Sequence, residues 1–218
     1  MEKTIKWLEN YWYHYKWVTI ITVSSLIALC VCLFQCSAKD KYDMYLLYAG
    51  PYYIGIEQNT AIIDAVNDHM ENEKQGVCVN NFTYVSKETQ KKYDQEGIYY
   101  NIGANAQQRE DFFDFLYTAN FNMIVLDPEL YSMIDSEKLL TPLAEISDKC
   151  ADASFDGYAI HLYDTSLPSK YKVFSEMPED TVICFRKNVL IQNLSSKNNK
   201  ETYNYHTYIF KKIIEDNT

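Results

Sequence analysis

The sequence predicts an α/β protein, with a mainly parallel sheet flanked by helices and preceded by one transmembrane helix. Near the N-terminus, 22 consecutive positions carry no charged side chain. Beyond them, apolar runs of strand length alternate with segments whose apolar residues recur at helical spacing. Apolar residues make up 47% and charged residues 23% of the 218 positions, which is typical of a folded protein and argues against a disordered chain.

The first element is a predicted membrane anchor over residues 17–38. At about 1.5 Å per residue, a helix of this length covers roughly 33 Å, enough to cross the hydrocarbon core of a bilayer. Beyond it lie Lys39 and Lys41, whereas the segment 1–16 ahead of it carries three lysines, which predicts a cytoplasmic N-terminus and an extracytoplasmic domain at 39–218. Aromatic and basic side chains in the lead-in suit the headgroup layer: Trp7, Tyr11, Trp12, Tyr13, Tyr15, Trp17, Lys3, Lys6 and Lys16.

Two alternatives keep this segment but change its fate. A cleaved signal peptide has the same basic start and apolar middle, but the 16-residue aromatic lead-in argues against cleavage. A bacterial lipoprotein signal would use Cys36 as its acceptor, but Phe34 and Gln35 stand where such signals carry small residues. All three readings export the rest of the chain, and the uncleaved anchor makes the lipid bilayer its first partner.

Charge and cysteine content exclude two classes of protein for the outer domain, nucleic-acid binders and disulfide-rich scaffolds. The whole chain carries a net charge of -10, and the outer domain holds 17 basic and 28 acidic side chains, so nucleic acid is not an expected partner. Three cysteines lie outside the anchor, Cys78, Cys150 and Cys184. An odd number of cysteines does not form a disulfide framework, although two of the three could pair. Their apolar neighbours favour the alternative that they are small buried side chains.

The outer domain begins with a predicted strand at 43–50, a continuous apolar run of the kind that is buried on both faces. Asn59 or Thr60 can cap a following helix that continues to about residue 72. A second strand at 77–85 is rich in β-branched and aromatic residues. The polar stretch 86–103 is predicted to be a loop, with at most a short edge strand at 98–102.

A second helix and a third strand follow. Asn105 and Gln108 have the spacing of a capping box, and the phenylalanines after them give this helix an apolar face. Residues 121–126 form a third buried strand. Asp127 then offers a helix cap with proline at the first helical position, which is a helix start. The alternation of strands and helices predicts right-handed crossovers and a parallel sheet covered on both faces.

The remaining predicted elements are a turn and short helix at 139–146, strands at 158–162 and 182–186, and a final helix at about 200–215. One face of this last helix is expected to carry an apolar stripe with lysine stems lying along it: Tyr205, Tyr208, Ile209, Lys212 and Ile213.

The order of these elements resembles the first lobe of an extracellular solute-binding protein of the two-lobed periplasmic-binding type. The similar phrases are an Asp-ending strand at 121–127, a leucine-rich turn at 140–146, a Gly-Tyr-Ala-Ile strand at 157–160, and the run at 182–188, which is similar to the strand that crosses to the second lobe. The resemblance covers roughly residues 42–215. It implies a single-lobe, solute-binding-like domain, although a second lobe of comparable size is missing.

Candidate ligand-binding residues follow from the predicted sheet. Ligands of open α/β sheets bind beyond the carboxyl ends of the strands. This rule points to Gly50, Tyr52, Tyr53 and Asp127, where tyrosine rings would suit a sugar or a peptide. The competing interpretation is that Tyr52 and Tyr53 only cover a small domain and that Asp127 is only a helix cap. No catalytic residue, metal ligand or cofactor is expected, because nucleophile elbows, nucleotide loops and zinc-ligand spacings are all missing outside the anchor.

The sequence therefore predicts a single-pass bacterial surface protein and not an enzyme. In the leading hypothesis the outer domain is a solute-binding-like module, accessory to a transporter permease or an envelope protein complex. The alternative is a structural or protein-interaction module that keeps the half-lobe fold and binds no small molecule. A hydrolase on an α/β scaffold is a third hypothesis, for which the sequence offers no nucleophile and base.

Overall fold

The computed structural model describes residues 2–37, 44–70, 76–119, 121–187 and 197–216. The chain forms two compact units, Met1–Lys41 and Tyr42–Thr218. The first unit is a single helix, and the second is an α/β domain.

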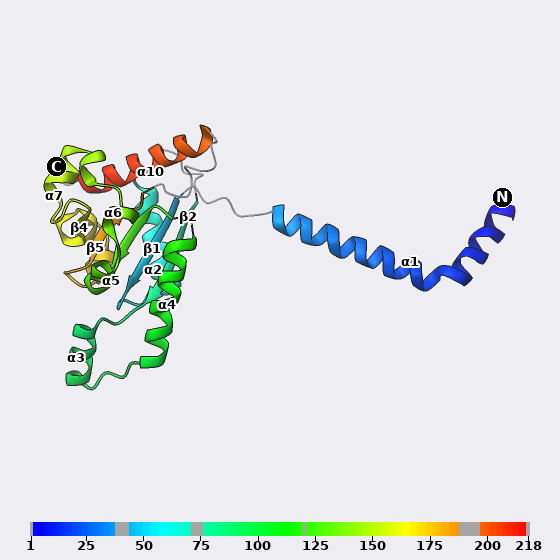
Figure 1. Cartoon of the computed structure of the whole chain (residues 1–218), viewed down its shortest axis with the longest axis horizontal. Helices are drawn as coiled ribbons and strands as arrows, with labels where there is room; N and C mark the ends of the chain where they lie inside the picture. Colours follow the sequence, from blue (N-terminus) through cyan, green and yellow to red (C-terminus); the bar gives the residue numbers. More distant parts are fainter. Residues whose placement is uncertain (1, 38–43, 71–75, 120, 188–196, 217–218) are drawn as a thin grey trace. The chain divides into compact units, whose positions relative to one another are not determined.

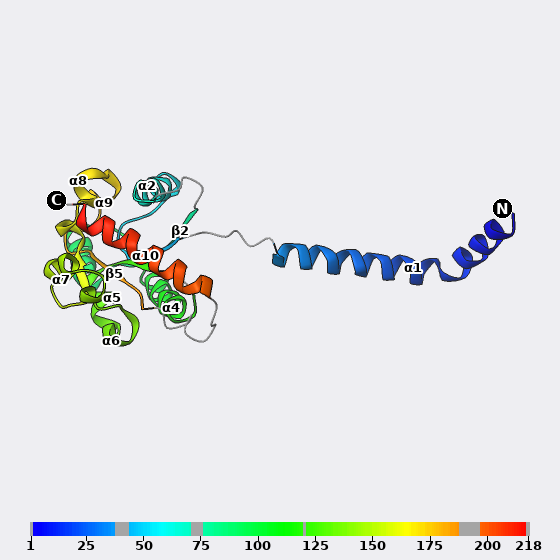
Figure 2. The same cartoon turned by 90° about the horizontal axis from the view of Figure 1, so that it is seen from above.

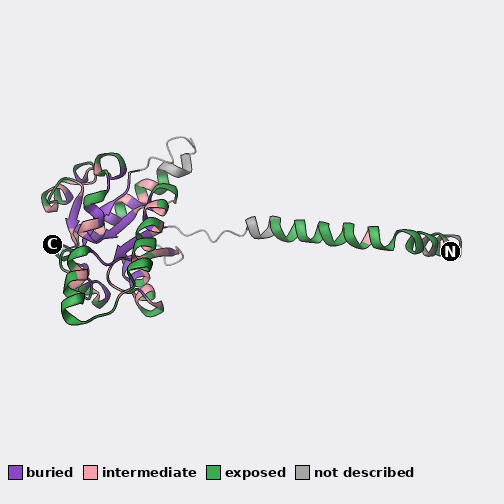
Figure 3. Ribbon diagram, turned by 60° about the horizontal axis from the view of Figure 1, so that its bottom comes forward, coloured by how far each residue is buried: buried purple, intermediate pink, exposed green. Residues whose placement is uncertain are grey.

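The N-terminal unit is the helix α1, Glu2–Ser37. The stretch of α1 that is long and apolar enough to cross a membrane is Asn10–Cys32, which overlaps the predicted span 17–38 but starts within the predicted lead-in. All of its residues except Thr19 are exposed (Figure 3). The aromatic lead-in is helical as well, and the rings of Trp7, Tyr11 and Tyr15 stack in turn with centroids 5.8 and 5.3 Å apart. The orientation of this helix in the membrane stays a prediction.

The domain is built on one five-stranded sheet in the order β2-β1-β3-β5-β4. The strands are β1 Met44–Gly50, β2 Val77–Thr83, β3 Met123–Leu126, β4 Ala159–His161 and β5 Val182–Phe185. β1 pairs in parallel with β2 and β3, whereas β5 pairs antiparallel with both β3 and β4. The α/β class is confirmed, but the expectation of a mainly parallel sheet was wrong, because the sheet is mixed.

The connections explain why the second half of the sheet is antiparallel. Helices that cross a sheet face connect the first three strands, which makes those strands parallel. The chain between β4 and β5 instead folds into three short helices, η2 Leu162–Asp164, α8 Leu167–Lys170 and α9 Lys172–Ser175. β5 therefore starts at the edge where β4 ends and runs back beside it.

Two apolar clusters cover the two faces of the sheet. Alternate residues of β1 belong to different clusters, with Leu46 in the first and Leu47 in the second, as the twofold alternation of a strand requires. The helix α2, Ile56–Asn67, packs on the first face, and α4, Ile102–Thr118, packs on the second. Figure 2 shows these two helices on opposite sides of β2.

The C-terminal helix α10, Lys197–Glu215, joins the first cluster. Its buried stripe differs from the predicted one: Ile209 and Ile213 are buried as expected, but Tyr208 is 38% exposed and Lys212 lies over the Tyr208 ring, 4.8 Å from its centroid. The buried stripe of α10 consists of His206, Ile209, Phe210, Ile213 and Ile214.

A helix stands where the sequence predicted a loop. The helix α3, Lys87–Glu96, is capped by Ser86, and Gly97 ends it in the left-handed conformation with φ 68°. The expected edge strand at 98–102 was wrong too, because Ile102 begins α4 and Asn101 caps that helix. Figure 1 shows α3 and α10 at opposite ends of the domain.

Four short helices lie between β3 and β4, of which the first two pack on the second face and the last two on the first face. They are α5 Pro128–Met133, α6 Ser136–Leu139, η1 Leu143–Glu145 and α7 Asp148–Ala153. Asp127 caps α5 as predicted, because its Oδ1 accepts a hydrogen bond of 2.8 Å from the Glu129 amide. Cys150 and Cys184 are buried free thiols and Cys78 is a half-buried one.

Candidate functional site

The candidate site lies at the carboxyl end of the parallel strands. The chain leaves β1 toward α2 on one face and leaves the neighbouring β3 toward α5 on the other face. Neighbouring strands whose connections diverge in this way open a crevice at their carboxyl ends. A cavity of about 590 Å³ lies here, lined by Pro51, Tyr52, Tyr53, Gln58, Ser86, Glu88, Thr89, Lys92, Tyr93, Glu176, Pro178 and Asp180.

The base of the site is fixed by backbone hydrogen bonds that extend the sheet. The Gly50 carbonyl accepts from the Tyr84 amide at 2.8 Å, and the Ala49 carbonyl accepts from the Asp127 amide at 2.8 Å. Gly50 and Asp127 therefore lie side by side at the carboxyl edge of the sheet, where the sequence predicted a ligand-binding site. Both are buried, and neither of them lines the cavity.

The first wall is the turn after β1. The buried Tyr48 hydroxyl accepts a hydrogen bond of 2.9 Å from the Tyr52 amide, which fixes the path of the turn. Burial raises the pKa of Tyr48 far above its ordinary value, so this hydroxyl stays protonated. A Cβ on Gly50 would lie 2.7 Å from the Tyr48 hydroxyl oxygen, so a glycine is needed there.

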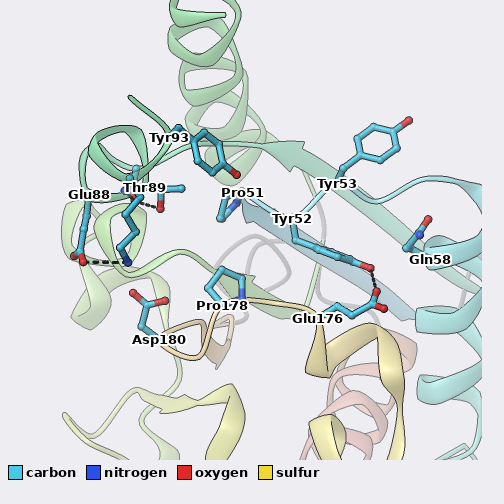
Figure 4. A pocket seen from close by; sticks show the side chains of 12 residues that line it. Pro51, Tyr52, Tyr53, Gln58, Glu88, Thr89, Tyr93, Glu176, Pro178 and Asp180 are labelled. Atoms are coloured by element: carbon cyan, nitrogen blue, oxygen red, sulfur yellow. Dashed lines mark hydrogen bonds and ion pairs between the residues drawn. The ribbon is translucent and has the colours of Figure 1, made fainter. Parts of the chain in front are cut away.

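Tyr52 connects the first wall to the segment before β5. Its hydroxyl donates a hydrogen bond of 2.5 Å to Oε2 of Glu176. Partial burial and the contact with Glu176 raise the pKa of Tyr52 to about 12, and Tyr52 and Lys172 lower the pKa of Glu176. Tyr53 is 72% exposed, and Figure 4 shows its ring extending away from Tyr93.

The second wall is α3. Its cap Ser86 accepts from the Thr89 amide at 3.3 Å, and Lys92 pairs with Glu88 one turn earlier at 3.3 Å. Tyr93 completes this wall (Figure 4). None of the residues of α3 is buried, so the helix is held by polar contacts rather than by the core. Besides its caps and local pairs, the Lys87 amide donates a hydrogen bond of 2.6 Å to Oε2 of Glu129 on α5.

The third wall is the segment before β5. It contributes Glu176, Pro178 and Asp180, which face α3 across the cavity in Figure 4. Asp180 is exposed, and no side chain in the described part of the chain pairs with it. The cavity walls thus carry three carboxylates and one ammonium group, and that ammonium is already paired with Glu88.

Asp127 adds a fourth carboxyl group behind the walls. It is only 6% exposed, and burial raises its pKa from 3.8 to about 6. Within this net value, hydrogen bonds from the Glu129 amide and the Ser86 side chain act to lower the pKa, and negative charges on Asp180 and Glu129 act to raise it. Near neutral pH, this group thus adds a negative charge close to the cavity.

The sequence located the edge of the sheet but missed two of the three walls. Among the predicted residues, Tyr52 and Tyr53 line the cavity, whereas Gly50 and Asp127 are buried at the sheet edge and do not line it. The α3 wall was treated as loop, although Ser86 as a cap and Gly97 as a stop are helix signals. The third wall could not be found, because it reaches this edge only if β5 runs antiparallel.

A second hollow lies beside the edge strand β2. It has a volume of about 430 Å³ and is lined by Asn81, Thr83, Val85, Tyr100, Asn101, Ala104, Asn105 and Gln108. Its walls carry amides and hydroxyls but no ionisable group except the Tyr100 phenol. Asn105 is used structurally, because its amide exchanges two hydrogen bonds, of 2.7 and 2.9 Å, with the Val85 backbone.

Neither a metal-ligand group in the described part of the chain nor a known relative assigns a chemistry to the cavity. No group of three or more His, Cys, Asp or Glu side chains there is arranged to hold a metal ion. No protein-family model matches the sequence, and neither the curated proteins nor the solved structures gave a match. The resemblance to a solute-binding lobe therefore stays a prediction, and function has to be argued from the cavity and the apolar N-terminal helix.

Proposed function

We propose that this protein is a membrane-anchored binding module whose α/β domain, exposed outside the cytoplasm, takes a small solute at the carboxyl edge of its sheet. It would serve a transporter or an envelope complex as an accessory subunit, with binding and no catalysis. One observation carries the proposal: the cavity of about 590 Å³ at the place where open α/β sheets bind ligands. Its volume is that of a sugar, an amino acid or a short peptide.

The helix α1 supports the anchored part of the proposal, because Asn10–Cys32 has the length and the apolar character of a membrane span. A tethered domain does not diffuse away with its ligand. It would instead hold solute close to a membrane partner, which favours an accessory role over that of a free carrier.

The proposed moving part is α3. In two-lobed binding proteins the ligand is held between lobes, whereas here the walls of the cavity come from one domain. α3 has no buried residue, so it can shift against the sheet at little cost in core packing. A ligand that contacts Tyr52 on one wall and Tyr93 on the other would bring α3 toward the sheet and order it.

A protein-interaction module is the second candidate, and the sheet edge favours it. β2 is one of the two edge strands of the sheet, and none of the described strands pairs with its outer side. An exposed strand edge can accept a strand of a partner protein. In this function, the partner and not a solute would be the ligand, and the polar hollow beside β2 would be part of the interface.

A thermal-shift screen of the full chain, reconstituted in phosphatidylcholine nanodiscs, distinguishes the two. A ligand that binds only the folded state raises the midpoint of unfolding in proportion to the logarithm of its concentration. The probes are sugars, amino acids, diamines, short peptides and metal ions. We expect a concentration-dependent rise with at least one class of solute. If every class leaves the midpoint unchanged, solute binding is refuted and the interaction module is favoured.

A further inference from the structure

We propose that the cavity selects solutes that carry an alkylammonium group, either a free amine or the side chain of a lysine in a peptide. This inference rests on the proposed function and names its ligand class. It is drawn from three properties of the walls: an excess of carboxylates, exposed aromatic faces beside prolines, and a surplus of hydrogen-bond acceptors.

The first property is charge. Glu88, Glu176 and Asp180 line the cavity against Lys92 alone. Lys92 is paired with Glu88, and Glu176 contacts Tyr52 and Lys172, so Asp180 is the carboxylate that no described residue neutralises. A ligand cation close to such a carboxylate is attracted by it, and the attraction is stronger near a protein surface than in bulk water. An anionic ligand would be repelled by a similar amount.

The second property is the aromatic surface. Tyr52 and Tyr93 lie on facing walls, with Pro51 beside Tyr52 and Pro178 opposite (Figure 4). An ammonium group within about 6 Å of a tyrosine ring is attracted by the negative face of that ring. The alkyl chain behind it can lie along the proline rings, as lysine stems do on apolar surfaces. The walls therefore match both parts of an alkylammonium ion.

The third property is hydrogen bonding. An ammonium group donates three hydrogen bonds and accepts none. The cavity offers carboxylate oxygens from three residues, whereas its charged donor, Lys92, is already used. A neutral sugar would meet the same acceptors but would leave the negative charge of the walls uncompensated. The acidic outer domain, with 28 acidic against 17 basic side chains, adds a field that attracts cations over a longer range.

The test is isothermal titration of the full chain in phosphatidylcholine nanodiscs, with empty nanodiscs as the blank. The ligands are cadaverine, a terminally blocked lysine tripeptide, the diol of the same length as cadaverine, and glucose. We expect an amine to bind at least about tenfold more tightly than the diol, because the diol lacks the charge. Tighter binding of cadaverine identifies a free amine as the natural ligand, and tighter binding of the tripeptide identifies a peptide.

Two neighbouring acids give a matched pair of variants. Asp180→Asn removes the unpaired carboxylate of the cavity, and Glu179→Gln removes the same charge from a residue that does not line it. We expect Asp180→Asn to weaken amine binding about three- to tenfold and Glu179→Gln by less than about twofold. Tyr93→Leu, compared with Tyr99→Leu at an 89% exposed position outside the cavity, tests the aromatic wall in the same way.

The outcomes separate the two proposals. Binding of glucose or the diol as tightly as cadaverine would overturn the amine class and leave solute binding standing. Equal effects of Asp180→Asn and Glu179→Gln would show that only the general acidity of the domain attracts amines, which would overturn the assignment to this cavity. No binding by any of the four ligands would overturn the amine class, and the wider thermal-shift screen would then decide on solute binding itself.

Discussion

The two ends of the sheet are built differently. At the amino end of β1, the helix α10 places Phe210 in the core, with its ring 5.1 Å from that of Phe185, and both side chains are fully buried. At the carboxyl end, α3 buries no residue, and the walls carry carboxylates, prolines and half-exposed tyrosines. One end of the same sheet is packed against a buried helix face, and the other carries the cavity.

This contrast has an energetic meaning. Buried apolar contacts set the global stability of a domain, while regions with few such contacts open locally at low free energy. Binding sites are drawn from these less stable regions. Each prediction below changes one end of the sheet and asks whether the expected difference between the two ends holds.

The largest effect is expected at the α10 end. Phe210→Ala leaves a cavity in the core and should lower the free energy of unfolding by about 3 to 5 kcal/mol. Tyr93→Ala on α3 should lower it by less than about 1 kcal/mol, because that side chain is not buried. Urea unfolding of the full chain in micelles, followed by the near-ultraviolet dichroism of its tyrosines, measures both. Equal losses would contradict the contrast between the two ends.

The next effect concerns the buried carboxyl group at the carboxyl end. The pKa of Asp127 is raised to about 6 in the folded state, so the folded state binds this proton more tightly than the unfolded state does. The free energy of unfolding therefore includes a contribution from this group of about 2 to 3 kcal/mol, which is fully present below about pH 4. This contribution is lost as the pH rises through about 6. Asp127→Asn keeps a capping side chain and should remove this loss.

The measurement is the free energy of unfolding of Asp127→Asn relative to the wild type at several pH values. The difference should grow in favour of the variant between about pH 4 and about pH 7. Asp135→Asn is the comparison, because Asp135 also caps a short helix but is exposed. The contact with Lys138 lowers the pKa of Asp135, so this variant should gain nothing relative to the wild type as the pH rises. A difference for Asp127→Asn that does not change with pH would refute the raised pKa.

A smaller effect is expected at the turn after β1. Tyr48→Phe removes the oxygen that accepts the Tyr52 amide proton while keeping the buried ring. The loss of this hydrogen bond should lower the free energy of unfolding by about 1 to 2 kcal/mol. It should also weaken ligand binding, since the turn positions Tyr52 at the cavity. Unchanged stability and unchanged binding in Tyr48→Phe would show that this hydrogen bond does not support the wall.

The smallest effect lies on the surface of the cavity. Tyr52→Phe removes the hydroxyl that donates to Glu176 and helps to keep the pKa of Glu176 below its ordinary value. We expect the pKa of Glu176 to rise in this variant, measured by carboxyl-carbon NMR across the acid range. Lys172→Met removes the other group that lowers this pKa and should act in the same direction. A pKa of Glu176 that does not respond to Tyr52→Phe would contradict the contact between the two walls.

The sequence predicted the local features of the fold better than its long-range ones. The apolar run of β1, the cap at Asp127 and the apolar anchor are signals within a few residues, and each has its place in the structure. The direction of β5 depends instead on where the chain between β4 and β5 runs, which no local pattern specifies. The mixed sheet could therefore not be predicted from periodicity.

The same distinction explains what was missed in the site. α3 has no apolar stripe, so a search for hydrophobic periodicity could not find it, although its end signals at Ser86 and Gly97 were present. On α10, the predicted apolar face included Tyr208, whereas the buried face includes Phe210 and Ile214. Both sets of residues fit the helical period equally well, so periodicity could not distinguish them. Tyr52 could be predicted because it directly follows β1. Asp180 could not, because it reaches the cavity only when β5 runs antiparallel to its neighbours.

The central claim is that ligands bind at the carboxyl edge, between the three walls. Hydrogen–deuterium exchange of the full chain in nanodiscs, with and without cadaverine, tests it most directly. The account predicts fast exchange in α3 without ligand and slower exchange with ligand at residues 51–58, 86–93 and 176–180, with α10 unchanged. Protection confined to β2 or α10, with no change in these three segments, would contradict it.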